Sequence, residues 1–523
     1  MQIRVPVLIV GAGAGGLATS ALLAKHGVRS LLIERRREAF IYPKARNLSF
    51  RSLEILRALG LSDEVHAVAE GVSAMVVKPT LNSPDEAPAI DIDGIFAPFA
   101  GLSPEPAAQY CPQSRLEPML LAETRRQGNE VRYGTELVSF QQDDTGVTAV
   151  VRERDSGRTE SVRADYLVAA DGVHSPTRDR LGVSTSGYGA LPIFVIFVYF
   201  KAPWRKFVPD LNDGDGVQVK NADVEGIFLV AEGDLGMFIT TYLPREGESA
   251  EQFTPERCAE LLTRAFGERI DTQVIEVASW QPYELVADQF RCGRVFLVGD
   301  AAHTMPPFKA GGANTASQSA DNLAWKLAAV LNGQARPALL GTYHAERHPV
   351  GRFNAHQSLT GPSIALLRLD DDRPQLAPEE EAPMFALLAG YQYRSAAVVS
   401  GEPPPADPDA VSLVEELRGQ PGTRVPHVWI REGVSTLDLL GPGFTVLTGD
   451  ERWRSAVASA AAALDIPVTA HRIDDEAWAA ATGLAPEGAL LIRPDAFVGW
   501  RAERLPSDSE GELRHALSAI LGR

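Results

Sequence analysis

The chain has 523 residues, too many for one hydrophobic core, so we expect two or three packed domains. Apolar residues make up 45% and charged residues 23%, which is typical of a globular protein, and the net charge of −18 argues against nucleic acid or an anionic membrane as the main partner. The three cysteines, at positions 111, 258 and 292, exclude a CxxC redox motif and do not indicate a disulfide framework, and we predict no metal site. The first apolar run, Val5 to Val10, is too short for a secretion signal, and no run of about 20 apolar residues follows. We therefore expect a protein of the cytoplasm.

The N-terminal segment predicts a strand, a glycine-rich turn, a helix and a second strand. Val5 to Val10 is a β-branched run suited to a buried parallel strand, and residues 17–25 have helical spacing. Between them, Gly11, Gly13 and Gly16 form the pattern G-x-G-x-x-G. In this motif the first glycine permits a tight turn, the second lets the backbone approach a pyrophosphate, and the third lets the helix pack closely on the strand. The segment therefore predicts a dinucleotide-binding turn.

Glu34 ends the second predicted strand, where its carboxylate can accept hydrogen bonds from ribose hydroxyls. The same charge would repel the 2′-phosphate of NADP, so we exclude NADP from this site. Two later strand ends carry an acid next to glycine, in residues 166–172 and 295–300. Together they indicate one extended dinucleotide that crosses several strand ends, which favours FAD over NAD.

The remaining segments predict a second sheet and a separate C-terminal domain. Residues 191–200, 226–230 and 236–243 are rich in β-formers and look like an insertion into the nucleotide-binding fold, and a long helix is expected near residues 315–332. Residues 401–409 contain four prolines and predict a linker. Beyond it, residues 425–523 alternate strands and helices.

The order of these motifs resembles the flavoprotein monooxygenases of the para-hydroxybenzoate hydroxylase superfamily (class A). The tail narrows the resemblance to the phenol and aromatic-polyketide hydroxylases that carry a C-terminal thioredoxin-like domain, through residues 422–429, 438–441 and 490–495. Residues 43–57 resemble the family's segment beside the flavin ribityl chain and phosphates, and residues 314–327 resemble its helix under the isoalloxazine ring.

The resemblance implies an α/β fold with a Rossmann-like FAD-binding domain, an inserted β-sheet substrate domain and a C-terminal thioredoxin-like domain. We expect the FAD-binding domain in residues 1–180 and 280–400. The substrate domain is expected in residues 181–279, with part of 75–110, and the thioredoxin-like domain in residues 410–523. Because every cofactor motif lies before residue 330, we also expect the tail to be dispensable for FAD binding.

Motifs and resemblance together predict a set of residues that bind FAD without covalent attachment, whereas no catalytic residue is assigned. The set comprises Gly11, Gly13, Ala14, Gly15, Gly16, Glu34, Arg35, Lys44, Arg46, Gln113, Asp171, Gly172, Asp300, Pro307, Gly312, Ala313 and Asn314. By resemblance, Gln113 contacts the flavin, Asp300 contacts the ribityl chain, and Gly312, Ala313 and Asn314 offer backbone groups to the isoalloxazine ring.

The implied activity is hydroxylation of an aromatic, polycyclic or other secondary-metabolite substrate. NADPH or NADH docks transiently as co-substrate, and O₂ forms a flavin C4a-hydroperoxide that attacks the ring. The alternatives are an FAD-scaffolded cyclase or an oxidase that needs no NAD(P)H, a halogenase, for which the chain lacks a W-x-W-x-I-P segment, and a flavin-bound regulatory protein. A monomer or homodimer is expected.

The chain departs from the family pattern in the loop before the long helix. Where the family has small flexible residues beside the oxygen-reactive site, this chain has Lys309 and Ala310. Either Lys309 faces solvent, or it alters oxygen activation so that the flavin serves another oxidation or a cyclisation. His174 and His303 are interpreted as turn caps rather than catalytic groups. The aromatic residues of 194–200 are expected to pack in a core, with one face of the strand a candidate for the substrate pocket.

Overall fold

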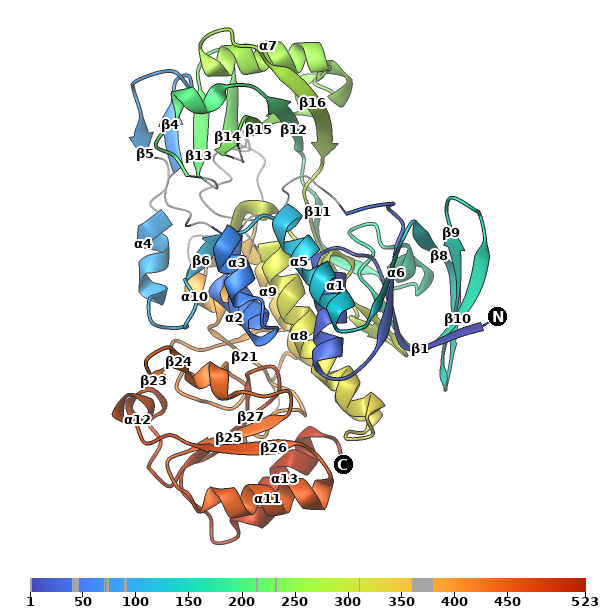
Figure 1. Ribbon diagram of the computed structural model, residues 1–523, viewed down its shortest axis with the longest axis vertical. Coiled ribbons are helices and arrows are strands. Elements are labelled where there is room, and N and C mark those ends of the chain that lie inside the picture. The colour runs from blue at the N-terminus through green and yellow to red at the C-terminus, as the bar shows by residue number, and fades with distance from the viewer. Residues whose placement is uncertain are drawn as a thin grey trace.

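The computed structural model describes residues 2–39, 47–69, 71, 75–88, 92–212, 215–230, 233–309, 311–359, 380–403 and 405–523. Figure 1 shows three parts along the long axis: a sheet capped by helix α7 at one end, a central α/β part, and a small α/β part at the other end. Among the described residues, none of the helices combines the length and the apolar character that crossing a membrane requires.

The central part is built on a largely parallel sheet whose strands are buried on both faces. Its main path has the order β18-β19-β10-β1-β2-β7, with β1 between β10 and β2. Val7, Leu8 and Ile9 are fully buried, which explains why this strand is a continuous apolar run rather than an alternating one. The strands are β1 (Gln2–Val10), β2 (Ser30–Glu34), β7 (Glu130–Tyr133), β10 (Thr159–Ala169), β18 (Arg291–Cys292) and β19 (Val295–Leu297), with β8 (Thr135–Asp143) and β9 (Gly146–Glu153) pairing antiparallel beside β10.

Two long helices pack together against this sheet. Helix α1 (Ala14–Lys25) follows the glycine turn, and helix α8 (Gly311–Leu331) begins four residues earlier than the sequence predicted. Both are buried along most of their length, because they pack against each other and α1 also packs on β1 and β2. The other helices of this part are α2 (Phe50–Ala58), α3 (Ser62–Val68), α5 (Gln113–Arg126), α6 (Pro176–Arg180), α9 (Gly341–Gln357) and α10 (Met384–Leu388), and α4 (Ile92–Phe96) lies beside it. The Rossmann-like fold is confirmed.

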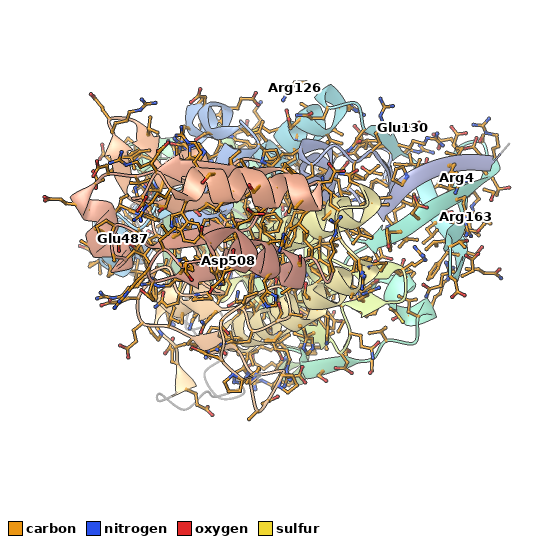
Figure 2. The ribbon with its side chains drawn as sticks, turned by 90° about the horizontal axis from the view of Figure 1, so that it is seen from below. Arg4, Arg126, Glu130, Arg163, Glu487 and Asp508 are labelled. Carbon is orange, nitrogen blue, oxygen red and sulfur yellow. The ribbon has the colours of Figure 1, made fainter. Side chains whose placement is uncertain are left out.

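The outer end of the central sheet carries charge, as expected where strands reach solvent. Arg4 of β1 and Arg163 of β10 are register partners, and Figure 2 shows them near each other at the rim of the molecule. Arg163 forms an ion pair at 2.8 Å with Asp143, the last residue of β8. The charged rim ends the apolar core at this edge.

The second sheet has the order β16-β12-β15-β14-β13-β4-β5, and helix α7 (Pro255–Phe266) covers one of its faces. Alternation along β12 divides its side chains: Ile196, Val198 and Phe200 pack with α7, whereas Phe197 and Tyr199 point to the opposite face. The strands are β4 (Met75–Lys78), β5 (Ala87–Pro88), β12 (Phe194–Lys201), β13 (Gly216–Lys220), β14 (Glu225–Val230), β15 (Leu235–Tyr242) and β16 (Gln273–Trp280). A smaller sheet, β11 (Thr185–Ala190), β17 (Tyr283–Ala287) and β20 (His303–Thr304), lies where the chain enters and leaves this part.

The C-terminal part has the topology of a thioredoxin fold. Strand β25 pairs parallel with β26 and antiparallel with β27, and β27 pairs antiparallel with β28. Helices α11 and α13 lie against each other on one face of this sheet. The elements are β25 (Phe444–Thr448), α11 (Trp453–Leu464), β26 (Val468–Arg472), α12 (Glu476–Thr482), β27 (Ala489–Ile492), β28 (Val498–Ala502) and α13 (Ser509–Ile520). The predicted thioredoxin-like domain is confirmed.

A buried network of charged side chains joins the C-terminal part to the central part. Arg493, which follows β27, donates to Glu346 of α9 at 2.6 Å, and Lys326 of α8 donates to the other oxygen of Glu346 at 2.7 Å. Arg51 of α2 donates to Asp321 of α8 and to the backbone carbonyl of Asp495, each at 2.8 Å. The side chains of Arg493, Glu346 and Lys326 are completely buried.

Burial raises the pKa of Glu346, but Arg493 and Lys326 outweigh it and hold that pKa well below its usual range. Burial lowers the pKa of Lys326 to about 8, although Glu346 opposes the shift. Each charge in the network is tolerable only because its partners are present. We therefore no longer expect the tail to be separable, since its removal would leave Glu346 without Arg493 and Arg51 without the Asp495 carbonyl.

Replacing Arg493 with Met tests this coupling. Glu346 and Asp495 would lose their main cation in a site closed to water, so we expect the free energy of unfolding to fall by about 3–5 kcal/mol. Urea unfolding followed by circular dichroism measures the change. The control is Arg472→Met, which removes an ion pair with Asp474 whose side chains are 49% and 83% exposed, and it should cost less than about 1 kcal/mol. Equal losses in the two variants would contradict the coupling.

Candidate functional site

Three loops meet at one edge of the central sheet because the strands before them run parallel. They follow β1 at Gly11, β10 at Ala170 and β19 at Val298. The Ala170 N–H donates to the Val10 carbonyl at 2.8 Å, and the Val298 N–H donates to the Ala169 carbonyl at 2.9 Å. The three predicted motifs are thus brought together at the carboxyl ends of the strands, where α/β folds bind their ligands.

The glycine turn leaves a cradle open at the start of α1. A Cβ on Gly11 would lie 2.2 Å from the Ala170 carbonyl oxygen, and one on Gly16 would lie 2.0 Å from that of Gly11, so both glycines are required by the fold itself. A Cβ on Gly13 would meet only Glu117 Oε1, at 3.9 Å. Gly13 caps α1 without a side-chain hydrogen bond, so the first N–H groups of the helix, those of Ala14, Gly15 and Gly16, are left for an anion. The cradle therefore fits the pyrophosphate of a dinucleotide.

The carboxylate of Glu34 is fixed beside this cradle. It is 5% exposed, and its Oε2 accepts the Ala12 N–H at 2.8 Å while Oε1 accepts the Arg36 N–H at 2.9 Å. The Arg36 guanidinium also donates to Oε1, at 3.2 Å. A carboxylate oxygen can accept two hydrogen bonds, so Oε2 can still accept one from a ribose hydroxyl. The side chain of Arg35 is exposed.

The second loop is held in shape by its own acid. Asp171 accepts hydrogen bonds from the Ser175 hydroxyl and from the Thr177 N–H at 3.1 Å, which closes the turn before α6, and Gly172 has a φ of +89° there. Arg178 then donates to the Ala301 carbonyl at 3.2 Å and so joins this loop to the third one. Neither Ser175 nor Arg178 was predicted as a site residue; both follow shortly after the strand end at residues 166–172 that the sequence indicated.

The third loop leads into the N-terminus of α8. Asp300 is exposed, Gly299 has a φ of +64°, and Pro307 is exposed in the short turn before the helix. Gly312, Ala313 and Asn314 form the first turn of α8, whose N–H groups lack partners within the helix. The Asn314 side chain accepts from the Ser52 hydroxyl at 2.6 Å and donates to the Asn47 carbonyl at 3.0 Å, so it anchors this turn to the segment before α2. Lys44, Arg46 and Ala310 lie outside the described residues.

Gln113 begins helix α5 and donates from its side chain to Glu117 Oε1, the same oxygen that faces Gly13. Glu117 is buried. Sequence reasoning named Gln113 but not Glu117, because a glutamate inside a helix carries no positional signal until the helix is placed against the turn.

Lys309 does not face solvent, so that interpretation is wrong. Its side chain is 7% exposed, and its ammonium group lies 3.0 Å from Glu381 Oε1. The Glu381 side chain is itself half exposed, so the pair lies at the boundary between the interior and water. The positive charge beside the candidate flavin loop is therefore balanced by a carboxylate that the sequence did not connect with it.

The two histidines near the motifs, His303 and His174, contact other side chains of the fold. His303 is completely buried in β20, with Nε2 3.2 Å from the Ser319 hydroxyl, and burial together with Arg347 lowers its pKa to about 3. It is a neutral core residue rather than a turn cap. His174 is exposed and lies edge-on to Tyr283.

One group of side chains in the described residues has the composition of a metal site. His344 and His348 lie one turn apart on α9, and the ligand atoms of these histidines and Asp409 are within 4.8 Å of one another. His344 Nδ1 already accepts the Phe290 N–H at 3.2 Å, and Asp409 is 3.0 Å from His348 and 3.6 Å from Arg352. These contacts account for the group as a clip between α9 and the segment before the C-terminal part.

Comparison with protein families supplies the decisive observation. Residues 4–358 match the family model described as FAD binding domain, and residues 418–523 match the model described as aromatic-ring hydroxylase, C-terminal. The chain belongs to the FAD-binding aromatic-ring hydroxylases. The predicted resemblance is confirmed, and with it FAD as the cofactor.

Members of this hydroxylase family resemble the chain over its whole length. Tetracenomycin A2 monooxygenase-dioxygenase of Streptomyces glaucescens is 38% identical, with 99% of this chain and 97% of that protein covered. A putative polyketide hydroxylase of Streptomyces halstedii is 37% identical over the same shares of the two chains. The crystal structure of aklavinone-11 hydroxylase with FAD and aklavinone has a TM-score of 0.87 at 32% identity and covers 99% of each chain. The protein is accordingly an enzyme, an FAD-dependent monooxygenase.

Two alanine substitutions separate the roles of the glycines in this hydroxylase. Gly13→Ala places its Cβ in open space, so the protein should fold with near-normal stability but bind FAD at least about tenfold more weakly, because the methyl group occupies the approach to the helix N-terminus. Gly16→Ala should instead lower the unfolding temperature even without FAD, because its Cβ meets a backbone carbonyl. Fluorescence titration with FAD and thermal unfolding of the apoprotein measure the two effects. Normal FAD affinity in Gly13→Ala would exclude the cradle as the pyrophosphate site.

Proposed function

We propose that this enzyme hydroxylates an aromatic polyketide, using O₂ and NADPH or NADH. The observation that carries the proposal is the likeness to polyketide-modifying relatives over the whole chain, including the tail. The shared tail matters because the FAD-binding domain alone is compatible with many oxidations.

In this proposal the predicted residues hold FAD as the motifs suggest. The turn at Gly13 and the start of α1 receive the pyrophosphate, Glu34 receives the ribose hydroxyls, and Asp300 receives the ribityl chain. The first turn of α8, held in place through Asn314, lies against the isoalloxazine ring, where its N–H groups and the helix dipole stabilise negative charge on the reduced ring. FAD supplies the oxygen-activating chemistry, and the protein supplies orientation and exclusion of water.

We propose the domain boundaries on the same basis. Residues 1–180 and 280–400 form the FAD-binding domain, and residues 181–279 with part of 75–110 form the substrate domain. Residues 410–523 form the thioredoxin-like domain. The course of the strands supports this division, since β4 and β5 join the second sheet and β19 returns to the first.

The substrate is proposed to lie against the face of the second sheet that α7 leaves uncovered. That face carries Phe197 and Tyr199, whose stacked rings have centroids 6.3 Å apart, and a row of aliphatic side chains from β14 and β15. These side chains are mostly buried, with Tyr199, Leu229 and Met237 only 2–3% exposed, and an apolar lining of this kind suits a planar polycyclic ligand. The aliphatic residues are Ile227, Leu229, Met237 and Ile239.

The alternative, in which FAD serves only as a scaffold or supports another oxidation, was motivated by Lys309. The ion pair of Lys309 with Glu381 is evidence against this alternative, because a lysine charge balanced by a carboxylate perturbs the flavin less than an isolated charge does.

Purified protein containing FAD provides the direct test of the proposed reaction. Addition of an aromatic polyketide should accelerate NADPH or NADH oxidation, and the product should carry one oxygen atom from ¹⁸O₂ by mass spectrometry. Substrate conversion without NAD(P)H, or a product without ¹⁸O, would exclude hydroxylation and favour the cyclase or oxidase alternative.

Replacing Lys309 with Met tests whether the ion pair isolates this charge from the chemistry. We expect the turnover number and the yield of hydroxylated product per NAD(P)H to stay within a few-fold of wild type, because a pair at the solvent boundary contributes little. Glu381→Gln is the matched control, since it leaves the ammonium group in place without its partner. A fall of about 30-fold or more in Lys309→Met would instead show that the charge acts on the reacting groups, as loss of about 2–4 kcal/mol would do.

A further inference from the structure

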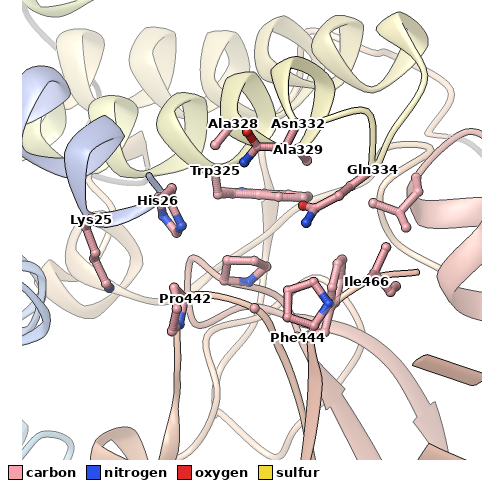
Figure 3. A pocket seen from close by; sticks show the side chains of 14 residues that line it. Lys25, His26, Trp325, Ala328, Ala329, Asn332, Gln334, Pro442, Phe444 and Ile466 are labelled. Carbon is pink, nitrogen blue, oxygen red and sulfur yellow. The ribbon is translucent and has the colours of Figure 1, made fainter. Parts of the chain in front are cut away.

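A cavity of about 180 Å³ lies between the central part and the thioredoxin-like domain. His26 at the end of α1 and Trp325 of α8 line one side, and Phe444 and Ile466 of the thioredoxin-like domain line the other (Figure 3). Trp325 is 14 residues beyond Gly311, so at 1.5 Å per residue the cavity lies about 21 Å along α8 from the proposed flavin site. It is therefore separate from the hydroxylation site.

Two polar groups on the cavity wall lack a hydrogen-bond partner among the described residues. They are Nε1 of Trp325, whose residue is 2% exposed, and Nε2 of His26. A buried donor or acceptor left unpaired costs about 1–3 kcal/mol, which is why such groups normally have partners. Trp453, a fully buried tryptophan of the thioredoxin-like domain, follows the rule and donates to the Glu487 carbonyl at 2.9 Å.

His26 is neutral at physiological pH, because burial and the neighbouring Lys25 lower its pKa to about 3. A neutral imidazole has one N–H and one nitrogen with a lone pair, so in the tautomer with the lone pair on Nε2 the ring can accept a hydrogen bond from the cavity. The buried part of the cavity thus offers a donor at Trp325 and an acceptor at His26, and Lys25, Asn332 and Gln334 add polar side chains to the wall.

The rest of the wall is largely apolar. Besides Phe444 and Ile466, two alanines of α8 and three prolines line the cavity, and the polar side chains of Asn332, which is exposed, and Gln334 complete the wall. A cavity of this size holds several waters of about 30 Å³ each, and an apolar cavity of about 150 Å³ takes up benzene. A single aromatic ring therefore matches the volume and the apolar part of the wall.

The charges near the cavity do not call for an anion. Lys25 lines the cavity, but its ammonium group is attracted by Asp321 of the buried network. Arg493, which lies 5.2 Å over the Trp325 ring, is paired with Glu346 and Asp495. A carboxylate in the cavity would compete with these partners, so a neutral ligand fits better.

We propose that this cavity is a second ligand site, which binds a small neutral phenol. One hydroxyl group meets both needs, because it donates to His26 Nε2 and accepts from Trp325 Nε1–H. The bound molecule contacts α1, α8 and the thioredoxin-like domain at once, and therefore stabilises their packing.

Crystals of the FAD-loaded enzyme soaked with 4-bromophenol test the site directly. We expect an anomalous bromine peak in the cavity, with the hydroxyl group between His26 and Trp325, whether or not the substrate site also binds the probe. Ordered water on both nitrogen atoms without bromine would overturn the proposal, as would bromine confined to the substrate site.

Affinity in solution is measured with 4-fluorophenol by ¹⁹F NMR. Ala329→Leu fills the cavity and should abolish the signal that belongs to it, which separates that signal from binding elsewhere. Trp325→Phe should weaken this binding about five- to tenfold, whereas Trp453→Phe, the same change outside the cavity, should leave it unaltered. His26→Phe, at the end of α1, removes the acceptor instead and should weaken binding similarly, so the test survives if Trp325→Phe does not fold. Equal affinities in the wild-type protein and the donor or acceptor variant would refute the proposed contacts.

Discussion

The buried carboxylate of Glu346 is the constraint on which the assembled structure depends. It lies in α9 of the central part, yet one of its two cations, Arg493, comes from the thioredoxin-like domain and the other, Lys326, comes from α8. A charge removed from water needs all of its partners, so α8, α9 and the C-terminal strand are held in one arrangement. The same helix α8 begins at the proposed flavin site, so the network fixes the far end of the element whose N-terminus faces the cofactor.

This constraint gives the thioredoxin-like domain a physical role without thiol chemistry. The chain has no CxxC motif, and the three cysteines lie at positions 111, 258 and 292, outside that domain. Its Arg493 and Asp495 instead complete a charge network with α2, α8 and α9, and its Arg424, ahead of β25, donates to Glu54 of α2 at 2.9 Å. The domain thus holds helices α2, α8 and α9 of the cofactor-binding part in place, and the interface between the two contains the cavity at Trp325.

The cofactor cradle could be predicted residue by residue because its requirements are local. Gly11 has a φ of +106°, Gly16 avoids a collision with Gly11 in the same turn, and Glu34 reaches the turn from the strand next to it. The contacts of Glu117, Arg178 and Glu381 could not be predicted in this way. Glu117 approaches Gly13 only after α5 packs beside α1, Arg178 joins two loops that are 123 residues apart, and Glu381 pairs with Lys309 across 72 residues. No spacing rule connects residues at such distances.

By itself, the sequence determined the Rossmann-like fold, the FAD motifs and the family, because strand hydrophobicity, glycine positions and turn chemistry act over a few residues and leave a readable pattern. Only the tertiary structure showed how Lys309 and His303 are buried and which charged partners the tail contributes to the central part. Each of those depends on burial and on partners from distant segments. A charged or polar side chain that is buried without a partner costs free energy, whereas the same side chain costs much less when it is paired or exposed to water. A lysine in a loop and an arginine after a strand look ordinary in a sequence, and only packing shows which of them the fold requires.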